Sequence, residues 1–187
     1  MKTKLSDIAV IQTGVFAKPG PLGDIVYLQG KHFGEDGQLV QDLLPDLRFS
    51  DIGPRHILAS NDILFTAKGT RNFAVHYQGS EHPAAASTTF IVIRLKQRCE
   101  VSPAFLTWFL NSPETQTHLK QSAKGTAIAS ISKKTLEDLE IPIPSIQKQE
   151  TILEIAKLSS KRNKLALRLT ELQNQNIQIT LQKAIYK

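Results

Sequence analysis

The stretch from Glu140 onward limits the fold more than any other part of the chain. It contains Ile141-Pro142-Ile143-Pro144, which must be extended, because proline fixes its own φ and disfavours the α region for the residue before it. No glycine or proline follows Pro144. We therefore expect one long helix from about Gln147 to Ala184, on the order of 57 Å long at about 1.5 Å per residue.

This helix carries apolar side chains in a heptad rhythm. One row consists of Leu158, Leu165, Leu172 and Ile179, and the other of Ile155, Arg162, Leu169, Asn176 and Lys183. Polar residues in such rows lower the stability of a coiled coil but fix its register and partner. We expect the helix to pair with another helix, and the simpler alternative is a solvated helix packed on its own domain. The residues expected to mediate dimerisation are Ile155, Leu158, Leu165, Leu169, Leu172, Asn176 and Ile179.

Length and composition fit one domain and an arm. The chain has 187 residues and a single cysteine, Cys99, so a disulfide framework is excluded and a reducing compartment fits best. Met1-Lys-Thr-Lys4 leads into a polar segment rather than an apolar signal sequence, and no apolar run approaches the roughly 18 residues of a membrane span. We expect a cytoplasmic protein without a membrane partner.

The net charge of +6 points to a polyanionic partner, although it is unevenly spread. Residues 147–187 hold 8 Lys and Arg against 3 Asp and Glu, whereas residues 1–146 hold 15 against 14. Within the latter, residues 47–98 hold 7 basic against 3 acidic residues, together with His56, His76 and His82. This segment is the expected nucleic-acid-facing region, with solvated charge as the alternative. The residues expected to contact DNA are Arg55, His56, Lys68, Arg71 and Lys124.

The first 146 residues have the pattern of a mixed α+β domain. Leu5–Gly14 predicts a short turn and then a strand that ends at Gly14, and Asn61–Thr66 predicts a turn into a strand. Further strands are expected at 25–29, 73–77 and 88–94, and the last, Thr88–Arg94, is the most apolar and therefore central. Residues 30–60 are rich in glycine and proline and predict loops. Ser102-Pro103 and Ser112-Pro113 each place serine at an N-cap and proline at the first helical position. Two helices are expected to begin there.

Motifs for catalysis are missing from the sequence. Gly30-Lys31 is followed by His32 rather than Ser or Thr, so the phosphate loop of nucleotide-binding proteins does not form. There is no Gly-x-Gly-x-x-Gly, no Gly-x-Ser-x-Gly and no histidine pair at metal-binding spacing. We expect no catalytic residue, no metal site and no cofactor. What remains is a binding surface and an arm.

Five segments resemble the DNA-specificity subunit of type I restriction–modification systems, and they follow the family's order over nearly the whole chain. They are Leu5–Gly14, Asn61–Gly69, Ala85–Ile93, Ile131–Leu136 and Ile141–Gln149. The last, which leads into the long helix, is the most specific. It departs from the family at Lys148, where an acidic residue is usual.

The resemblance implies a sequence reader without catalytic residues that binds double-stranded DNA and recruits two methyltransferase subunits, with a motor–nuclease subunit added for restriction. Residues 1–146 would form a target recognition domain, and residues 147–187 a helix for dimerisation, spacing and methyltransferase docking. Full-length family members hold two recognition domains apart with two antiparallel helices. This chain has one of each, so the resemblance implies a half-subunit that works as a homodimer, or a fragment.

A protein of another class remains an alternative. In this alternative the chain is an assembly module whose arm dimerises and whose domain binds protein rather than DNA. The net charge of only +1 on residues 1–146 favours it. Binding to DNA that weakens steeply with salt would distinguish the two.

Overall fold

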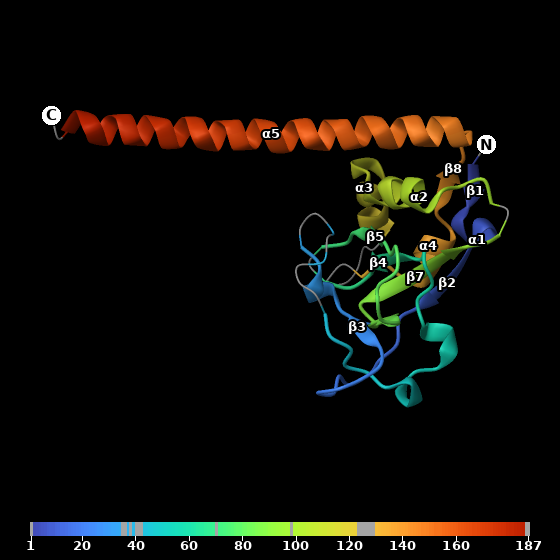
Figure 1. The fold of residues 1–187 in the computed structure, drawn as a ribbon. Coiled ribbons are helices and arrows are strands. Elements are labelled where there is room, and N and C mark those ends of the chain that lie inside the picture. Colours follow the sequence, from blue (N-terminus) through green and yellow to red (C-terminus); the bar gives the residue numbers. More distant parts are fainter. Residues whose placement is uncertain are drawn as a thin grey trace. The chain divides into compact units, whose positions relative to one another are not determined.

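The computed structural model describes residues 2–34, 37, 39, 43–69, 71–97, 99–122 and 130–185 (Figure 1). The chain divides into two compact units, Met1–Ile146 and Gln147–Lys187. The first unit combines sheets with short helices and the second is one long helix, which confirms the predicted α+β class with a long C-terminal helix. Within the described residues, no helix is both long and apolar enough to cross a membrane.

A four-stranded antiparallel sheet forms the centre of the first unit. Its strands are β2 (Ala9–Thr13), β7 (Phe90–Leu95), β4 (Ile63–Thr66) and β5 (Ala74–His76), in that order across the sheet. β7 lies between β2 and β4, and its first four residues are buried. The prediction that the most apolar strand is central is therefore confirmed. Apolar side chains on both faces require a covering layer on each side.

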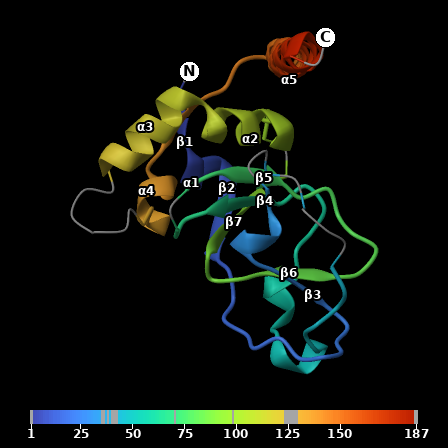
Figure 2. The same ribbon diagram turned by 90° about the vertical axis from the view of Figure 1, so that its left-hand side faces the viewer.

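Helices α2 (Pro103–Asn111) and α3 (Pro113–Ser122) lie on one side of this sheet, and β3 lies on the other (Figures 1 and 2). Both helices begin at the predicted prolines, and the Ser102 hydroxyl accepts a hydrogen bond from the Phe105 N–H at 3.1 Å. α2 packs along β5, and the Asn111 side chain exchanges two hydrogen bonds of 2.8 Å with the backbone of Ala74. This amide satisfies backbone groups at the outer edge of the sheet.

The opposite layer is built on β3 (Val26–Leu28) and β6 (Ala84–Ala86), which pair in parallel. Around them lie the short 3-10 turns η1 (Gly30–His32), η2 (Phe49–Asp51) and η3 (Pro54–His56), in the predicted loop-rich region. β3 is buried on both faces. Val26 and Leu28 pack in one core cluster with Leu64 and Phe90, while Ile25 and Tyr27 pack in another with Leu47 and Ile52.

Close backbone contact joins β2 to this layer. The Val15 N–H donates to the Ala86 carbonyl at 2.9 Å, and a side chain at Gly14 would place its Cβ only 2.0 Å from the Ser87 carbonyl oxygen. Glycine is therefore required where β2 ends.

The remaining elements join the start of the chain to the end of the unit. β1 (Lys2–Lys4) pairs antiparallel with β8 (Glu140–Pro142), which begins the predicted extended segment. Helices α1 (Leu5–Ile8) and α4 (Lys133–Glu137) pack against each other beside β2. The sequence pattern did not predict α4, although Ser132 caps it through the Thr135 N–H at 3.0 Å.

The second unit is α5, a helix of 40 residues from Ile146 to Ile185. It matches the predicted helix to within one residue at each end. Every residue from Lys161 to Ile185 is exposed. A helix with a polar and an apolar face normally buries the apolar face, so α5 leaves a hydrophobic face without cover in the single chain.

Candidate nucleic-acid interface

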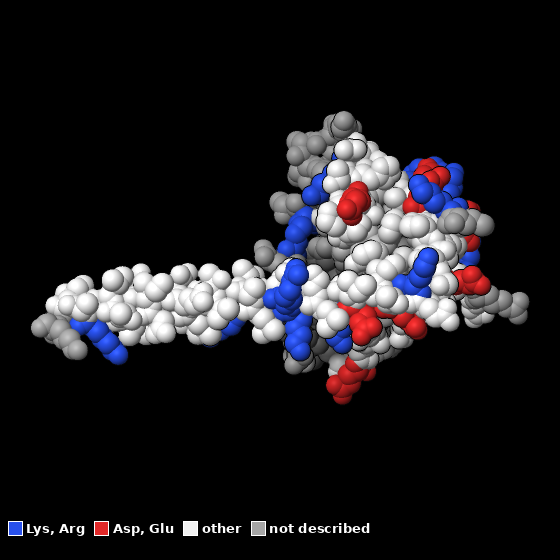
Figure 3. Space-filling model, turned by 90° about the horizontal axis from the view of Figure 1, so that it is seen from above, with Lys and Arg blue, Asp and Glu red and all other residues white. Residues whose placement is uncertain are grey.

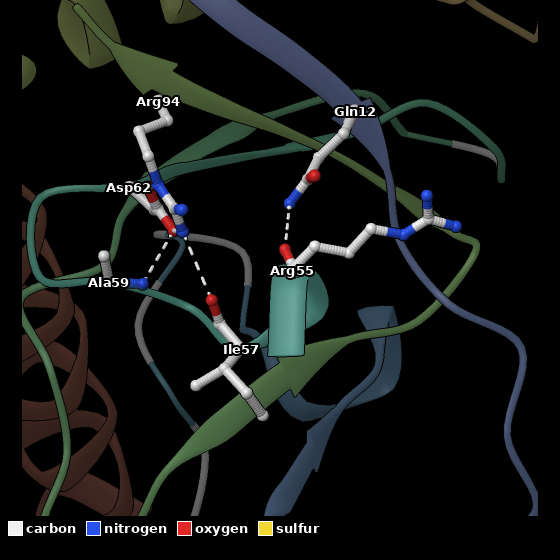
Figure 4. Close-up of polar contacts among 6 residues, drawn as sticks. All are labelled: Gln12, Arg55, Ile57, Ala59, Asp62 and Arg94. Carbon is white, nitrogen blue, oxygen red and sulfur yellow. Dashed lines mark hydrogen bonds and ion pairs between the residues drawn. The ribbon is translucent and has the colours of Figure 1, made fainter. Parts of the chain in front are cut away.

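Two predicted DNA-contacting residues lie on η3, in what we name the Arg55 turn (Gly53–Ile57). Pro54 sits at the first helical position, and the His56 and Ile57 N–H groups close the turn onto the Gly53 and Pro54 carbonyls at 2.9 and 3.2 Å. Arg55 is exposed, and its side chain points away from the Arg94–Asp62 pair (Figure 4). The guanidinium is thus presented to solvent by a short, well-defined turn.

The backbone of the Arg55 turn is held by three strands. Gln12 Nε2, from β2, donates to the Arg55 carbonyl at 3.0 Å, and Arg94 Nη2, from β7, donates to the Ile57 carbonyl at 3.2 Å (Figure 4). Ile57 also forms a β-bridge with Ala85 of β6. A turn tied at several points keeps its exposed side chain in one place, which is what base or phosphate recognition requires.

The anchor of this arrangement is an ion pair between Arg94 and Asp62. Arg94 donates from Nε to Asp62 Oδ1 at 2.7 Å and from Nη2 to Asp62 Oδ2 at 2.6 Å. Asp62 is 1% exposed and accepts a further bond of 2.8 Å from the Ala59 N–H. The hydrogen bond to Asp62 raises the pKa of Arg94. Because its charge is paired, Asp62 can be buried without a large penalty.

His56 does not add charge to the turn. Burial lowers the pKa of His56, and the neighbouring positive charge of Arg55 lowers it further, so the ring is mostly neutral at pH 7. Arg55 Nε lies 3.2 Å from His56 Nε2 and donates to it. Burial also lowers the pKa of His76. Both shifts reduce the positive charge that these two histidines add to residues 47–98.

Lys68 and Arg71 lie in the connection between β4 and β5, which we name the β4–β5 turn (Ala67–Phe73). Both side chains are exposed, and Gly69 between them has a φ of +127°, which favours glycine. The position of Lys68 in an exposed turn is compatible with phosphate contact.

Arg71 is partly engaged within the domain. Its Nη2 donates to the Gly34 carbonyl at 2.8 Å, and its guanidinium carbon lies 5.0 Å from the centre of the Phe73 ring. These contacts fix the side chain over the ring, and such cation–π contacts contribute about 0.5–1 kcal/mol at exposed sites.

The β4–β5 turn has its own internal support. The Thr66 hydroxyl accepts from the Phe73 N–H at 2.7 Å, and Asn72 Nδ2 donates to the Thr66 carbonyl at 2.7 Å. Asn72 is 8% exposed. The two turns are thus built separately, one by β2, β6 and β7 and the other by Thr66 and Asn72. Lys124, also expected to contact DNA, lies outside the described residues.

The supporting residues were not identified from the sequence. Gln12 and Arg94 hold the Arg55 turn across sequence separations of 43 and 37 residues, and Arg94 is itself held by Asp62, 32 residues earlier in the chain. Gln12 and Asp62 stand in the segments Leu5–Gly14 and Asn61–Gly69 that resemble the specificity family, whereas Arg94 lies just outside the segment Ala85–Ile93. Asn61 precedes it with a φ of +73°, a left-handed conformation in which asparagine is enriched.

The predicted dimerisation residues form an exposed face on α5. Exposure is 62% for Ile155, 59% for Leu158, 60% for Leu165 and 58% for Leu169, with 46% for Leu172 and 49% for Ile179. Asn176 is exposed as well. With Ile155 at heptad position a, Leu158 lies at d, and the two rows together form what we name the seam. From Lys161 onward every described residue of the seam is exposed.

Metal-binding side chains are not clustered in the part of the chain that the structure describes. No group of three or more His, Cys, Asp and Glu residues there could hold a metal ion. Cys99 is a free, partly buried thiol.

Comparison with known proteins identifies a family. Residues 54–178 match the model of the type I restriction modification DNA specificity domain. The matched range begins at Pro54 of the Arg55 turn and includes most of α5. No curated protein matches the chain.

Solved structures share the fold at low sequence identity. The HsdS subunit from Thermoanaerobacter tengcongensis aligns with a TM-score of 0.61 and 16% identity over 87% of this chain and 37% of that one. The type I restriction–modification S subunit from M. genitalium gives 0.56 and 17% over 87% and 39%. A chain from a study of complex assembly and conformational transition in a type I R-M system gives 0.61 and 15% over 87% and 38%. The chain thus spans less than two fifths of the length of these proteins.

Proposed function

Because the chain belongs to the family of type I restriction–modification DNA specificity domains, we propose that it recognises a DNA sequence and directs methyltransferase and motor–nuclease subunits to it. The observation that carries this proposal is the family match over residues 54–178, which includes both an exposed cationic turn and the long helix. The chain itself would be non-catalytic, and the recruited subunits would supply the chemistry.

The globular unit, residues 1–146, serves as the target recognition domain in this proposal. Specific DNA binding needs side chains held rigidly against base edges and cations on phosphates that set the register. The Arg55 turn supports such a role, because its backbone is fixed by Gln12 and Arg94 while the Arg55 guanidinium is exposed. Lys68 and Arg71 would make further contacts from the β4–β5 turn. Lys124 is proposed as an additional contact from its position in the sequence.

The second unit serves as a spacer and dimerisation arm. Its seam is exposed in the single chain, and a second copy of α5 would bury it. We propose an antiparallel pair, which makes the two recognition domains equivalent about a two-fold axis.

A two-fold dimer has a direct consequence for the target. Each copy presents the same side chains, so the recognised DNA would be two inverted identical half-sites separated by a spacer of any sequence. The rigid pair of helices would set the length of that spacer. Inserting one heptad adds about 10 Å, which corresponds to about three base pairs of rise.

The test is to co-express the chain with the methyltransferase encoded beside it, to purify the complex, and to map methylated sites in the host genome. The proposal predicts a bipartite palindromic motif, and the same half-sites with a longer spacer after insertion of one heptad. A bipartite motif without palindromic symmetry would contradict the homodimer. Methylation without any motif would contradict sequence recognition.

The assembly-module function has one observation in its favour, the net charge of +1 on residues 1–146. It predicts that the purified chain dimerises but is not retained on heparin or mixed-sequence DNA at low salt. The proposed DNA-recognition function instead predicts binding to both. The logarithm of the binding constant then falls linearly with the logarithm of the salt concentration.

A further inference from the structure

Four of the seven basic residues of α5 lie on one face of one segment, while Arg162 of the same segment lies in the seam. Between Ile155 and Thr170 the helix has no acidic residue. Charged side chains gather in this part of the helix and leave a long white stretch before the last lysine (Figure 3). Four exposed basic residues follow at intervals of four, three and four positions: Lys157, Lys161, Lys164 and Arg168. At about 3.6 residues per turn they fall within about 60° of arc, and we name them the basic stripe.

The basic stripe runs beside the seam rather than within it. With Ile155 at position a and Leu158 at d, Lys157 and Lys164 occupy position c, and Lys161 and Arg168 occupy g. The opposite flank of the seam, at positions b and e, is uncharged over the same segment. It consists of Ala156, Ser159, Asn163, Ala166 and Thr170. The two sides of the seam therefore differ completely in charge.

We propose that two antiparallel copies of α5 join their basic stripes into a single positive face, and that this face binds the phosphates of the spacer DNA between the two half-sites. The inference rests on the proposed function, because it takes the homodimer and the bipartite site from it. In an antiparallel pair, g positions lie beside g positions and e beside e, so one face of the pair collects both stripes and the other collects both uncharged flanks.

Apolar matching along the seam supports a particular register. Position a of one helix packs opposite position d of its antiparallel neighbour. Matching Ile155 with the partner's Leu172 also matches Leu158 with the partner's Leu169, and it sets Arg162 opposite the partner's Leu165 in the two central layers. Lys161 then lies beside the partner's Arg168, and the two-fold axis repeats this contact. Eight cations, four from each copy, come together around that axis.

Such a face is unfavourable unless an anion neutralises it, because like charges at neighbouring g positions repel. Arg168 forms an ion pair with Glu171 at 3.1 Å, but both side chains are exposed, so the pair offsets little of this repulsion. A polyanion lying along the face would relieve it. DNA binding and dimerisation would then strengthen each other reciprocally.

Geometry and chemistry favour spacer DNA as the occupant. The stripe from Lys157 to Arg168 spans 11 residues, or about 16 Å, which equals roughly five base pairs of rise. The two-fold axis of the helix pair coincides with the dyad of a palindromic site. That dyad runs through the spacer and not through the half-sites. Spacer sequence is not read, and lysine contacts to phosphates carry no sequence information.

The experiment compares two full-length variants with equal loss of charge. Lys161→Gln with Arg168→Gln neutralises the g positions, and Lys120→Gln with Lys133→Gln removes two exposed charges from the globular unit as the matched control. Binding to a mixed-sequence duplex is measured over a range of salt concentrations. The dimer dissociation constant is measured by sedimentation with and without the same duplex.

The dimer of the stripe variant neutralises up to four fewer phosphates, so its salt slope is expected to be shallower by about 3 to 4, at about 0.9 per phosphate. Without DNA its dimer is expected to be tighter than that of the wild type, and the duplex no longer strengthens it. The control keeps the wild-type slope and the wild-type coupling.

If the wild-type dimer binds DNA but the stripe variant has the same salt slope as the wild type, the proposed basic face is wrong while the dimer stands. An equal change in the control would also overturn the basic face, because general charge would then explain the effect. Loss of methyltransferase retention with an unchanged salt slope would assign the stripe to an acidic protein surface instead. A wild-type chain that stays monomeric would overturn the dimer and the basic face together.

Discussion

Replacing two seam leucines with aspartate tests the proposed dimer most directly. Leu165 and Leu172 both lie in the d row of α5, one heptad apart. Each is exposed in the single chain, so aspartate at these positions disturbs little in the folded monomer beyond local helix packing. A change in assembly would therefore reflect the seam and not a loss of folding.

The expected magnitude follows from the area still to be buried. Leu165 is 60% exposed and Leu172 is 46% exposed, so about half of each side chain remains to be covered by a partner. Complete burial of a leucine contributes about 1.5–3 kcal/mol, which leaves roughly 0.8–1.5 kcal/mol for each residue on pairing. Four such residues per dimer contribute about 3–6 kcal/mol, or more than a hundredfold to more than ten-thousandfold in the dissociation constant. Burying aspartate in their place adds a further penalty.

Sedimentation velocity over a concentration series provides the assay. A wild-type chain that dimerises at micromolar concentration is expected to become monomeric when Leu165 and Leu172 are both changed to aspartate. The matched control changes Leu167 and Leu181 to aspartate. Both leucines are also exposed but lie at position f, away from the seam. Helical circular dichroism of both variants shows whether α5 is retained.

Two results would refute the reasoning. If the seam variant dimerises as well as the wild type, the two heptad rows do not form the interface. If the control at Leu167 and Leu181 dissociates equally, another face of α5 mediates pairing, and the basic stripe does not occupy the position assigned to it.

Three further predictions concern the globular unit. Arg71→Ala together with Lys68→Ala is expected to make the salt slope of DNA binding shallower by about one for each phosphate that is no longer neutralised, and unchanged affinity and slope would move the interface elsewhere. Asp62→Asn breaks an ion pair with a buried carboxylate and a partly solvated arginine, so the free energy of unfolding in urea should fall by about 2 kcal/mol. Asp138→Asn, which breaks a surface ion pair, is the control and should change that free energy little. Burial lowers the pKa of His76, so the unfolded chain binds a proton at this residue more tightly than the folded chain does. The free energy of unfolding, measured in urea, should therefore fall as the pH drops below about 6.5, and His76→Gln should reduce that fall.

Local signals predicted the parts of the fold that depend on neighbouring residues. The absence of glycine and proline after Pro144, together with the heptad rows, predicted α5 to within one residue at each end. The serine–proline pairs predicted the first residues of α2 and α3, because capping and proline geometry act within one turn. The apolar run in β7 predicted a central strand, because apolar side chains on both faces of a strand must both be covered.

Features that depend on distant partners were not predicted. β6 consists of Ala84, Ala85 and Ala86, and alanine has a low intrinsic preference for strands. Its parallel pairing with β3, nearly 60 residues earlier in the chain, makes it a strand. The bond between Gln12 and the Arg55 carbonyl similarly requires β2 to lie beside η3. The sequence thus identified Arg55 as a candidate, but not the residues that hold its turn.

The distribution of charge between the two units bears on how affinity and selectivity are divided. Several cations of the globular unit are occupied internally: Arg94 pairs with Asp62, and Lys96 Nζ donates to the Ser6 and Asp7 carbonyls at 3.0 and 2.9 Å. A recognition domain with a net charge of only +1 binds unrelated DNA weakly, because non-specific affinity comes from phosphate neutralisation. The proposed basic face of the paired helices would supply that affinity only after dimerisation. A single chain would then release wrong sequences readily, while a dimer on two correct half-sites would gain phosphate contacts over the spacer between them.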